Sequence, residues 1–213
     1  TARQQFESSY PFHPAVLSLF ERKWQALPRF QQTRGVLRLL ALWVAKAYND
    51  GYKRLTKDGL ITLGTAPLED ANFRAAVFEQ LGENRLEAAV TTDIAGRDDS
   101  HSIRLDNEAI DAIKKARLHK KCATTIFFES NGGQTAQGLA TLPEIKLSVG
   151  DPDLDIGLVD GAIQSLLDGC YYLTAVNNKY KYSIHENLIK RYSDRRASIQ
   201  PPAINELVEG EIR

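Results

Sequence analysis

Apolar residues recur at three- and four-residue intervals through the first quarter of the chain, the spacing of one face of an α-helix. One such run follows Pro14, a residue that suits the first turn of a helix, and ends at the next proline. A second run begins after a predicted N-cap at Thr33 and weakens at Asn49-Asp-Gly51. The pattern therefore predicts two helices, and we expect Trp24 and Trp43 to pack between them.

Helical spacing returns at Asp70, after a loop that contains a short extended piece, Leu60–Leu63. It is interrupted at Gly82 and then continues up to the polar segment Gly96–His101. This segment is the predicted domain boundary. We expect a helical domain at 1–100, a second domain at 101–198, and a linker or tail at 199–213.

Asp106 is the predicted N-cap of a helix after this boundary. The segment Cys122–Phe128 that follows has the β-branched and aromatic residues of a strand, but it continues a helical run, so a helix is favoured. A flexible loop is expected from Ser130 to Thr141. Two further helices are predicted at Leu142–Val149 and Asp155–Gly169.

Two β-rich runs near the end of the chain flank Asn177-Asn-Lys179 and predict a hairpin. A closing helix is expected at about Glu186–Arg195. The succession of three helices and a hairpin is the order of a winged-helix domain, in which the hairpin is the wing. The sequence thus predicts a mainly α fold with a small β component.

Charge and composition restrict the function only weakly. The chain has 27 basic and 27 acidic residues, and 43% of its residues are hydrophobic. No apolar run approaches the roughly 18 residues of a membrane helix, and the start of the chain does not resemble a signal peptide. Cys122 and Cys170 are expected to be buried thiols in a reducing compartment, and the protein to be cytoplasmic. Because the chain begins at Thr1 and contains no Met, we expect it to be a fragment.

A search for catalytic motifs yields no complete set. The sequence contains neither the G-x-x-x-x-G-K-[ST] loop that cradles ATP phosphates nor the G-x-S-x-G elbow of serine hydrolases. The four histidines lack partners at metal-binding spacing and are interpreted as structural. Asp151, Asp153 and Asp155 alternate like a calcium loop, but Ile156 stands where that loop needs Gly.

Two basic clusters remain as candidate sites. Arg34 and Arg38 share one face of the second predicted helix, with Arg34 in its first turn. A positive charge at a helix N-terminus opposes the helix dipole, so Arg34 needs an anionic partner. That partner is either an ATP phosphate or a carboxylate such as Glu7 or Glu21.

The second cluster runs from the hairpin to the closing helix and suits nucleic-acid phosphates. Its candidate binding residues are Lys179, Tyr180, Lys181, Arg195 and Arg196. The preceding helix, however, carries Asp155, Asp160 and Asp168 and no basic residue, which is unfavourable for reading a DNA groove. A winged helix that only packs against other protein is therefore the alternative.

Tyr10-Pro-Phe-His-Pro14 and Gln31–Ala41 resemble segments of large prokaryotic AAA+ ATPases of domain-of-unknown-function family 499. Relatives of that family include the ATPases of bacteriophage-exclusion systems. The resemblance extends over most of the chain through residues 64–69, 88–93, 121–133 and 194–198.

This resemblance implies a helical lid domain followed by a winged-helix domain, with the Walker A and B motifs N-terminal to the region seen here. Arg34 is then expected to be a sensor-two arginine that reaches the γ-phosphate of ATP, and Arg38 to support it. The chain itself is expected to be non-catalytic and to need no cofactor, whereas the parent ATPase would use ATP and Mg²⁺.

The leading hypothesis is that the chain senses ATP through Arg34 and couples it to DNA or protein binding in phage defence. Its expected partners are the upstream P-loop core and DNA or a defence-system protein, without a membrane. The alternative is a stand-alone winged-helix module that binds DNA or protein and has no ATPase connection. A purely structural scaffold is a third hypothesis.

Overall fold

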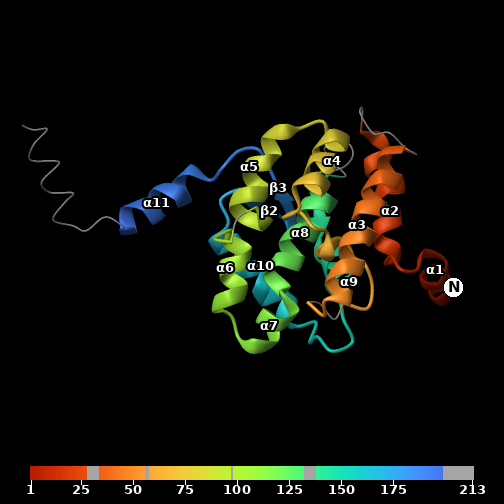
Figure 1. Cartoon of the computed structure of the whole chain (residues 1–213). Helices are drawn as coiled ribbons and strands as arrows, with labels where there is room; N and C mark the ends of the chain where they lie inside the picture. Colours follow the sequence, from red (N-terminus) through yellow and green to blue (C-terminus); the bar gives the residue numbers. More distant parts are fainter. Residues whose placement is uncertain (28–33, 56–57, 97, 132–137, 199–213) are drawn as a thin grey trace, which may run out of the picture.

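A computed structural model describes residues 1–27, 34–55, 58–96, 98–131 and 138–198. The fold is mainly helical with one three-stranded antiparallel sheet, which confirms the predicted fold class (Figure 1). The helices are α1 (Ala2–Ser9), α2 (Pro14–Arg22), α3 (Arg34–Tyr52), α4 (Ala71–Leu81), α5 (Glu87–Ala89), α6 (His101–Glu108), α7 (Asp111–Ala116), α8 (Leu118–Ser130), α9 (Leu142–Val149), α10 (Leu158–Gly169) and α11 (Leu188–Ser198). The strands are β1 (Ala140–Thr141), β2 (Leu173–Val176) and β3 (Lys179–Tyr182). Three 3-10 turns, η1 (Trp24–Ala26), η2 (Leu63–Thr65) and η3 (Asn84–Leu86), and a π-helix, η4 (Val90–Ala95), complete the described elements.

Helix α8 forms the centre of the core, which resolves the ambiguity over Cys122–Phe128 in favour of a helix. All its residues except Lys120 are buried, and it packs against α6, α9, α10, η2 and β3. The two tryptophans do not pack directly between α2 and α3 as predicted. Both stack instead on Phe128 of α8, with ring centroids 5.5 Å away for Trp24 and 5.7 Å away for Trp43.

Helices α2 and α4 begin where the sequence predicts, with Pro14 as the first residue of α2. The side chain of His13 accepts from the amide of Ala15 ahead of α2, and Asp70 caps α4, which ends at Gly82 in the left-handed conformation. Helix α3 continues through Asn49-Asp-Gly51 to Tyr52. The predicted N-cap of α3, Thr33, lies outside the described residues.

The prediction for Asp106 is wrong in an informative way. Asp106 lies inside α6, and its carboxylate accepts from the amides of His119 and Lys120 at 2.9 and 3.0 Å. It also contacts His119 Nδ1 at 2.9 Å. Asp106 therefore caps α8, thirteen residues away, rather than the helix that follows it.

The C-terminal part has the predicted winged-helix order with an additional strand. Helix α8, β1, α9, α10, β2 and β3 follow one another, and the strands lie in the order β1-β3-β2. Asn177 and Asn178 have φ angles of 51° and 57°, as the two-residue turn of a tight hairpin requires. The pairing of Ala140 with Tyr180 adds β1, which the sequence did not reveal.

One hydrophobic core extends across the predicted boundary at residues 96–101. The buried carboxylate of Asp93 in η4 joins the two sides, because it accepts from the amides of Tyr171 and Tyr172 at 3.0 and 2.7 Å. The division at residue 100 stays a prediction, and the proposed tail at 199–213 lies outside the described residues. In the described part of the chain, no helix is long and apolar enough to cross a membrane.

Candidate functional site

Arg34 and Arg38 lie in the first two turns of α3 and differ in their surroundings. Arg38 Nη1 donates to Glu79 Oε2 on α4 at 2.8 Å. Arg34 is exposed, and its guanidinium has no ion-pair or hydrogen-bond partner among the described residues. Glu7, one of its two predicted carboxylate partners, pairs with Arg3 at 2.8 Å. An external anion therefore remains the candidate partner for Arg34.

Close packing fixes the helix turn that carries Arg34. The neighbouring Gly35 is buried, and a Cβ atom added there would lie 2.4 Å from Oε1 of Gln80. Gln80 belongs to α4 and is itself buried. Glycine thus allows the start of α3 to lie close against the Gln80 side chain of α4, while the neighbouring Arg34 is exposed.

The solvent side of α3 is apolar from Leu37 to Tyr52, which is more than four turns. Leu37 is 60% exposed, Tyr48 71% and Tyr52 80%, and the rings of the two tyrosines stack with their centroids 6.4 Å apart. Ala41 and Val44 are exposed between them, so the five residues follow helical spacing. We call these five residues the α3 face. The opposite side of α3 is also apolar, since Leu39 and Trp43 are buried in the core.

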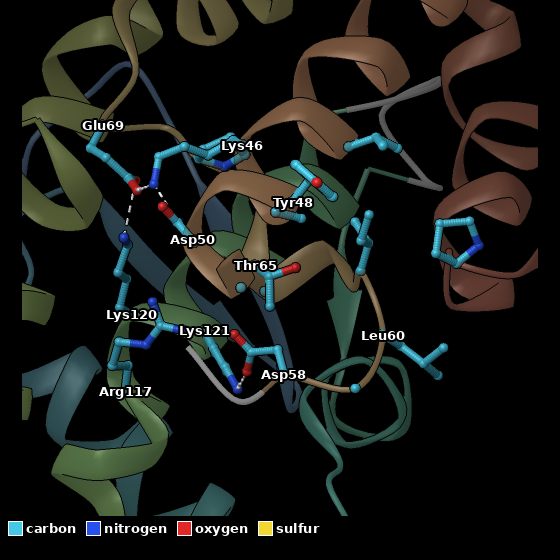
Figure 2. Close-up of a pocket in the computed structure, with 18 of the residues that line it drawn as sticks. Lys46, Tyr48, Asp50, Asp58, Leu60, Thr65, Glu69, Arg117, Lys120 and Lys121 are labelled. Atoms are coloured by element: carbon cyan, nitrogen blue, oxygen red, sulfur yellow. Dashed lines mark hydrogen bonds and ion pairs between the residues drawn. The ribbon is translucent and has the colours of Figure 1, made fainter. Parts of the chain in front are cut away.

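A cavity of about 430 Å³ lies beside the C-terminal half of the α3 face (Figure 2). Apolar and aromatic side chains line part of it, among them Tyr10, Val44, Tyr48 and Leu60. Charged side chains also line it, among them Lys46, Asp58 and Glu69. Ion pairs there link α3, the 58–69 loop and α8, so the cavity joins three segments that are far apart in the sequence.

These ion pairs reveal a basic segment that the sequence reasoning missed. Lys114, Lys115, Arg117, Lys120 and Lys121 lie within eight residues, and this density was the available signal. Arg117 and Lys121 both pair with Asp58, at 2.7 and 2.6 Å, and Lys120 pairs with Glu69 at 3.0 Å (Figure 2). Because these carboxylates neutralise three of the five cations, the segment is better explained as a tie between α8 and the loop than as a free basic patch.

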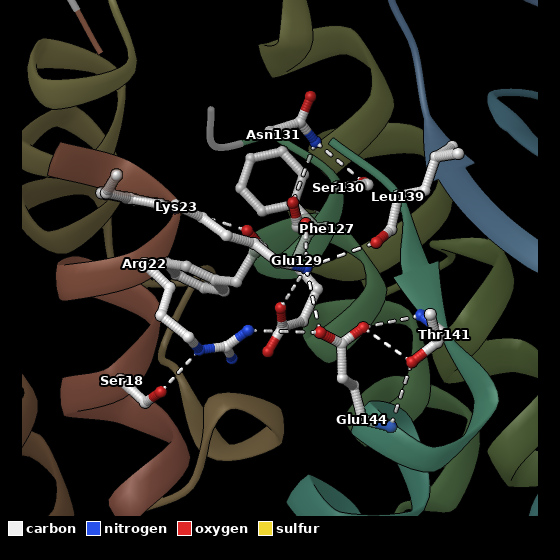
Figure 3. A network of polar contacts seen from close by, with 12 residues as sticks. Ser18, Arg22, Lys23, Phe127, Glu129, Ser130, Asn131, Leu139, Thr141 and Glu144 are labelled. Carbon is white, nitrogen blue, oxygen red and sulfur yellow. Dashed lines mark hydrogen bonds and ion pairs between the residues drawn. The ribbon is translucent and has the colours of Figure 1, made fainter. Parts of the chain in front are cut away.

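A buried charged network lies at the other end of α8 (Figure 3). Lys23 Nζ is 2.6 Å from Glu129 Oε2 and 3.3 Å from Glu144 Oε1, and it donates to the carbonyls of Glu129 and Leu139. Burial raises the pKa of Glu129, although Lys23 opposes this. Burial also acts to raise the pKa of Glu144, but hydrogen bonds from Thr141 and the charge of Lys23 lower it overall. The network ties η1 to the start of the winged helix.

The predicted nucleic-acid residues do not form one continuous surface. Lys179 is exposed and Lys181 is half-buried on β3, whereas Tyr180 between them is only 9% exposed. Tyr180 cannot offer its ring to a base in this position, because it packs against the core as its strand alternates. Arg195 and Arg196 belong to α11, which projects away from the rest of the molecule (Figure 1).

The helix that precedes the wing is unsuited to phosphate contact. Asp160 and Asp168 are exposed on α10; Asp160 pairs with Lys146 at 2.7 Å, and Asp168 accepts from Gln164 at 3.1 Å. The sequence-based expectation of an acidic third helix is thus matched by its exposed surface.

Metal and thiol chemistry find little support in the described part of the chain. No group of three or more metal-ligating side chains comes together there. His101 and His119 are buried and contact Asp93 and Asp106 at 2.7 and 2.9 Å, in agreement with their structural interpretation. Both cysteines are buried free thiols as predicted, and burial raises the pKa of each.

Comparison with known proteins identifies one family. A family model described as the DUF499 second domain matches residues 1–157. No match was found among curated proteins or among solved structures.

Proposed function

Because the chain belongs to the DUF499 family, through the second domain of that family at residues 1–157, we propose that it is the nucleotide-sensing and coupling region of an AAA+ ATPase. In this proposal, Arg34 contacts the γ-phosphate of ATP bound to another domain of the protein. The winged helix then passes the nucleotide state to a DNA or protein partner. The resemblance to bacteriophage-exclusion ATPases makes phage defence the proposed setting.

The observation that carries this proposal is the exposed guanidinium of Arg34, which has no described partner at the start of α3. A positive charge at this end of a helix is unfavourable by a few tenths to about 1 kcal/mol, and an anion removes that penalty. Arginine is always charged and presents a planar fork of donors, which suits a phosphate. Gly35 and Gln80 hold the helix turn in position, so the charge is directed before ATP arrives.

The proposal assigns different roles to the two arginines. Arg38 already has a carboxylate partner, Glu79, and contributes by keeping α3 against α4. Arg34 acts on the nucleotide, by stabilising the negative charge on the transferring phosphoryl group. Removing such an arginine contact is expected to be far more harmful to turnover than to folding.

The test uses the full-length DUF499 protein that carries this chain. We expect Arg34→Ala to lower the ATP turnover number at least 100-fold, a loss of the size seen for single charge-stabilising donors. Arg38→Ala is the matched control on the same helix face, and it should lower turnover less than about threefold, because it removes only an exposed ion pair. Unchanged turnover in Arg34→Ala, with the thermal unfolding midpoint unchanged, would reject the sensor role.

A second candidate function is DNA binding by the wing, as in a stand-alone winged-helix module. It is favoured by the exposed Lys179 and the half-buried Lys181 on β3, and it is opposed by the acidic surface of α10. It predicts duplex binding that weakens as salt rises and that is lost in Lys179→Ala/Lys181→Ala. Absence of duplex binding at low salt would leave protein partners as the output of the winged helix.

A further inference from the structure

Helix α3 is apolar on both sides, and only one side is covered. Along its whole described length, the exposed polar residues are Arg34, Arg38 and Asn49. A helix that is hydrophobic all round is typical of a buried position. Leu37, Tyr48 and Tyr52 nevertheless face solvent, where each adds apolar area that water disfavours. An exposed apolar surface of this kind is typical of an interaction site.

The C-terminal half of the α3 face borders a cavity. Val44 and Tyr48 line the cavity of about 430 Å³ together with Tyr10 and Leu60, and Figure 2 shows Tyr48 and Leu60 beside it. A side chain from a docking partner can therefore enter beside the helix instead of lying on a flat surface. Buried anchors of this kind supply most of the free energy of many protein interfaces.

The position of Arg34 restricts the chemistry of whatever covers the face. Arg34 precedes Leu37 by three residues and Ala41 by seven, so it lies in line with the apolar residues. A partner that covers the whole face would also remove Arg34 from water, and a buried, unpaired charge is strongly unfavourable. The partner must therefore be apolar over most of its length and must present an anion at the end that meets Arg34.

We propose that the α3 face is the docking surface for the first domain of the same DUF499 protein, with bound nucleotide as the anion opposite Arg34. The assignment rests on the proposed function for the identity of that anion. The family description numbers the present region as the second domain, so a first domain belongs to the family. Tyr10, which follows α1 in the chain, also lines the cavity beside the α3 face.

The experiment places a photo-cross-linking amino acid at position 37 or 48 of the full-length protein. Leu37 and Tyr48 are both exposed in the second domain, so the replacement does not disturb its core. The matched control is position 176, because Val176 is 62% exposed but lies on the wing. After illumination, the linked peptides are identified by mass spectrometry of the monomer band.

We expect positions 37 and 48 to link to peptides of the first domain at least ten times more efficiently than position 176. Links from 37 and 48 to a second copy of the chain, equal yields at all three positions, or no links from 37 and 48 would each overturn the proposal. A second variant, Val44→Asp, should reduce the yield from position 48 at least tenfold, because it places a carboxylate within the apolar contact.

Failure of this proposal can be separated from failure of the sensor role. If Arg34→Ala leaves ATP turnover unchanged while positions 37 and 48 still link to the first domain, the sensor role is rejected and the docking surface is retained. Arg34→Ala with reduced turnover, but without links from positions 37 and 48, would keep the sensor role and reject the docking surface.

Discussion

Helices α8 and α3 are both rich in apolar residues, but the fold surrounds them differently. Helix α8 is covered on all sides, and even its buried charged residues are paired: Lys121 with Asp58, and Glu129 with Lys23. Helix α3 is covered only along the side of Leu39 and Trp43, while Tyr48 and its apolar neighbours contact solvent. Ion pairs therefore fix α8 within the core, whereas one side of α3 is not covered by any described element. The difference indicates that α8 serves the fold, whereas α3 is suited to contact another domain or protein.

The largest expected effect comes from the charged end of α8. Lys23→Ala should lower the free energy of unfolding by about 3–5 kcal/mol, because it leaves the carboxylate of Glu129 buried without its counter-charge. Denaturant unfolding of the chain measures the change.

Two further variants sharpen the result for Lys23. Arg22 is half exposed and lies 3.6 Å from Glu144, so Arg22→Ala should cost less than about 1 kcal/mol. The double variant Lys23→Met/Glu129→Leu removes both charges and should recover part of the stability lost in Lys23→Ala. Equal losses for Arg22→Ala and Lys23→Ala would contradict the buried network.

The next prediction compares the two sides of α3 with one pair of leucines. Leu39 is 1% exposed, and Leu39→Ala should destabilise the chain by about 2–5 kcal/mol through the cavity it leaves. Leu37→Ala, two residues away on the α3 face, should change the free energy of unfolding by no more than about 0.5 kcal/mol. Urea unfolding of both variants is the measurement.

The outcome for Leu37 also bears on the interface. If Leu37→Ala were as destabilising as Leu39→Ala in the chain alone, the α3 face would be part of the core rather than a free surface. A neutral result there, together with loss of cross-linking in the full-length protein, would separate folding from docking.

Local signals in the sequence predicted most of the fold. Pro14 at the start of α2, the break at Gly82 and the Asn-rich turn of the hairpin act over a few residues, so they can be recognised without a structure. Asp106 was misassigned because its partners lie on another helix. Strand β1 was missed because two residues carry no periodic pattern, and only the pairing with β3 defines them.

The candidate site was predictable only in part, for a similar reason. Charge and position singled out Arg34, Arg38, Lys179 and Lys181, whereas the burial of Tyr180 depends on the packing of the sheet. The apolar pattern of α3 is visible in the sequence, but helical spacing alone does not distinguish its covered side from its exposed side. Helix α3 has two apolar sides, and the positions of α4 and α8 decide which side is covered. Local sequence rules do not give those positions.

The smallest expected effect concerns Glu144, which shares Lys23 with α8. Because the pKa of Glu144 is lowered in the folded chain, its charge stabilises the fold above the ordinary glutamate pKa of about 4.3, and this contribution is lost as the pH falls through the lowered value. Glu144→Gln keeps an acceptor for the amide of Thr141 and removes only the charge.

At pH 7 we expect Glu144→Gln to be less stable than the parent chain by about 1 kcal/mol at most, and the difference should shrink as the pH is lowered below 4. Glu129 titrates in the opposite sense, since its pKa is raised, but it is present in both proteins and its contribution largely cancels. Urea unfolding at a series of pH values gives the difference directly. A difference that did not shrink on acidification would mean that the charge of Glu144 does not help to hold the winged helix against η1.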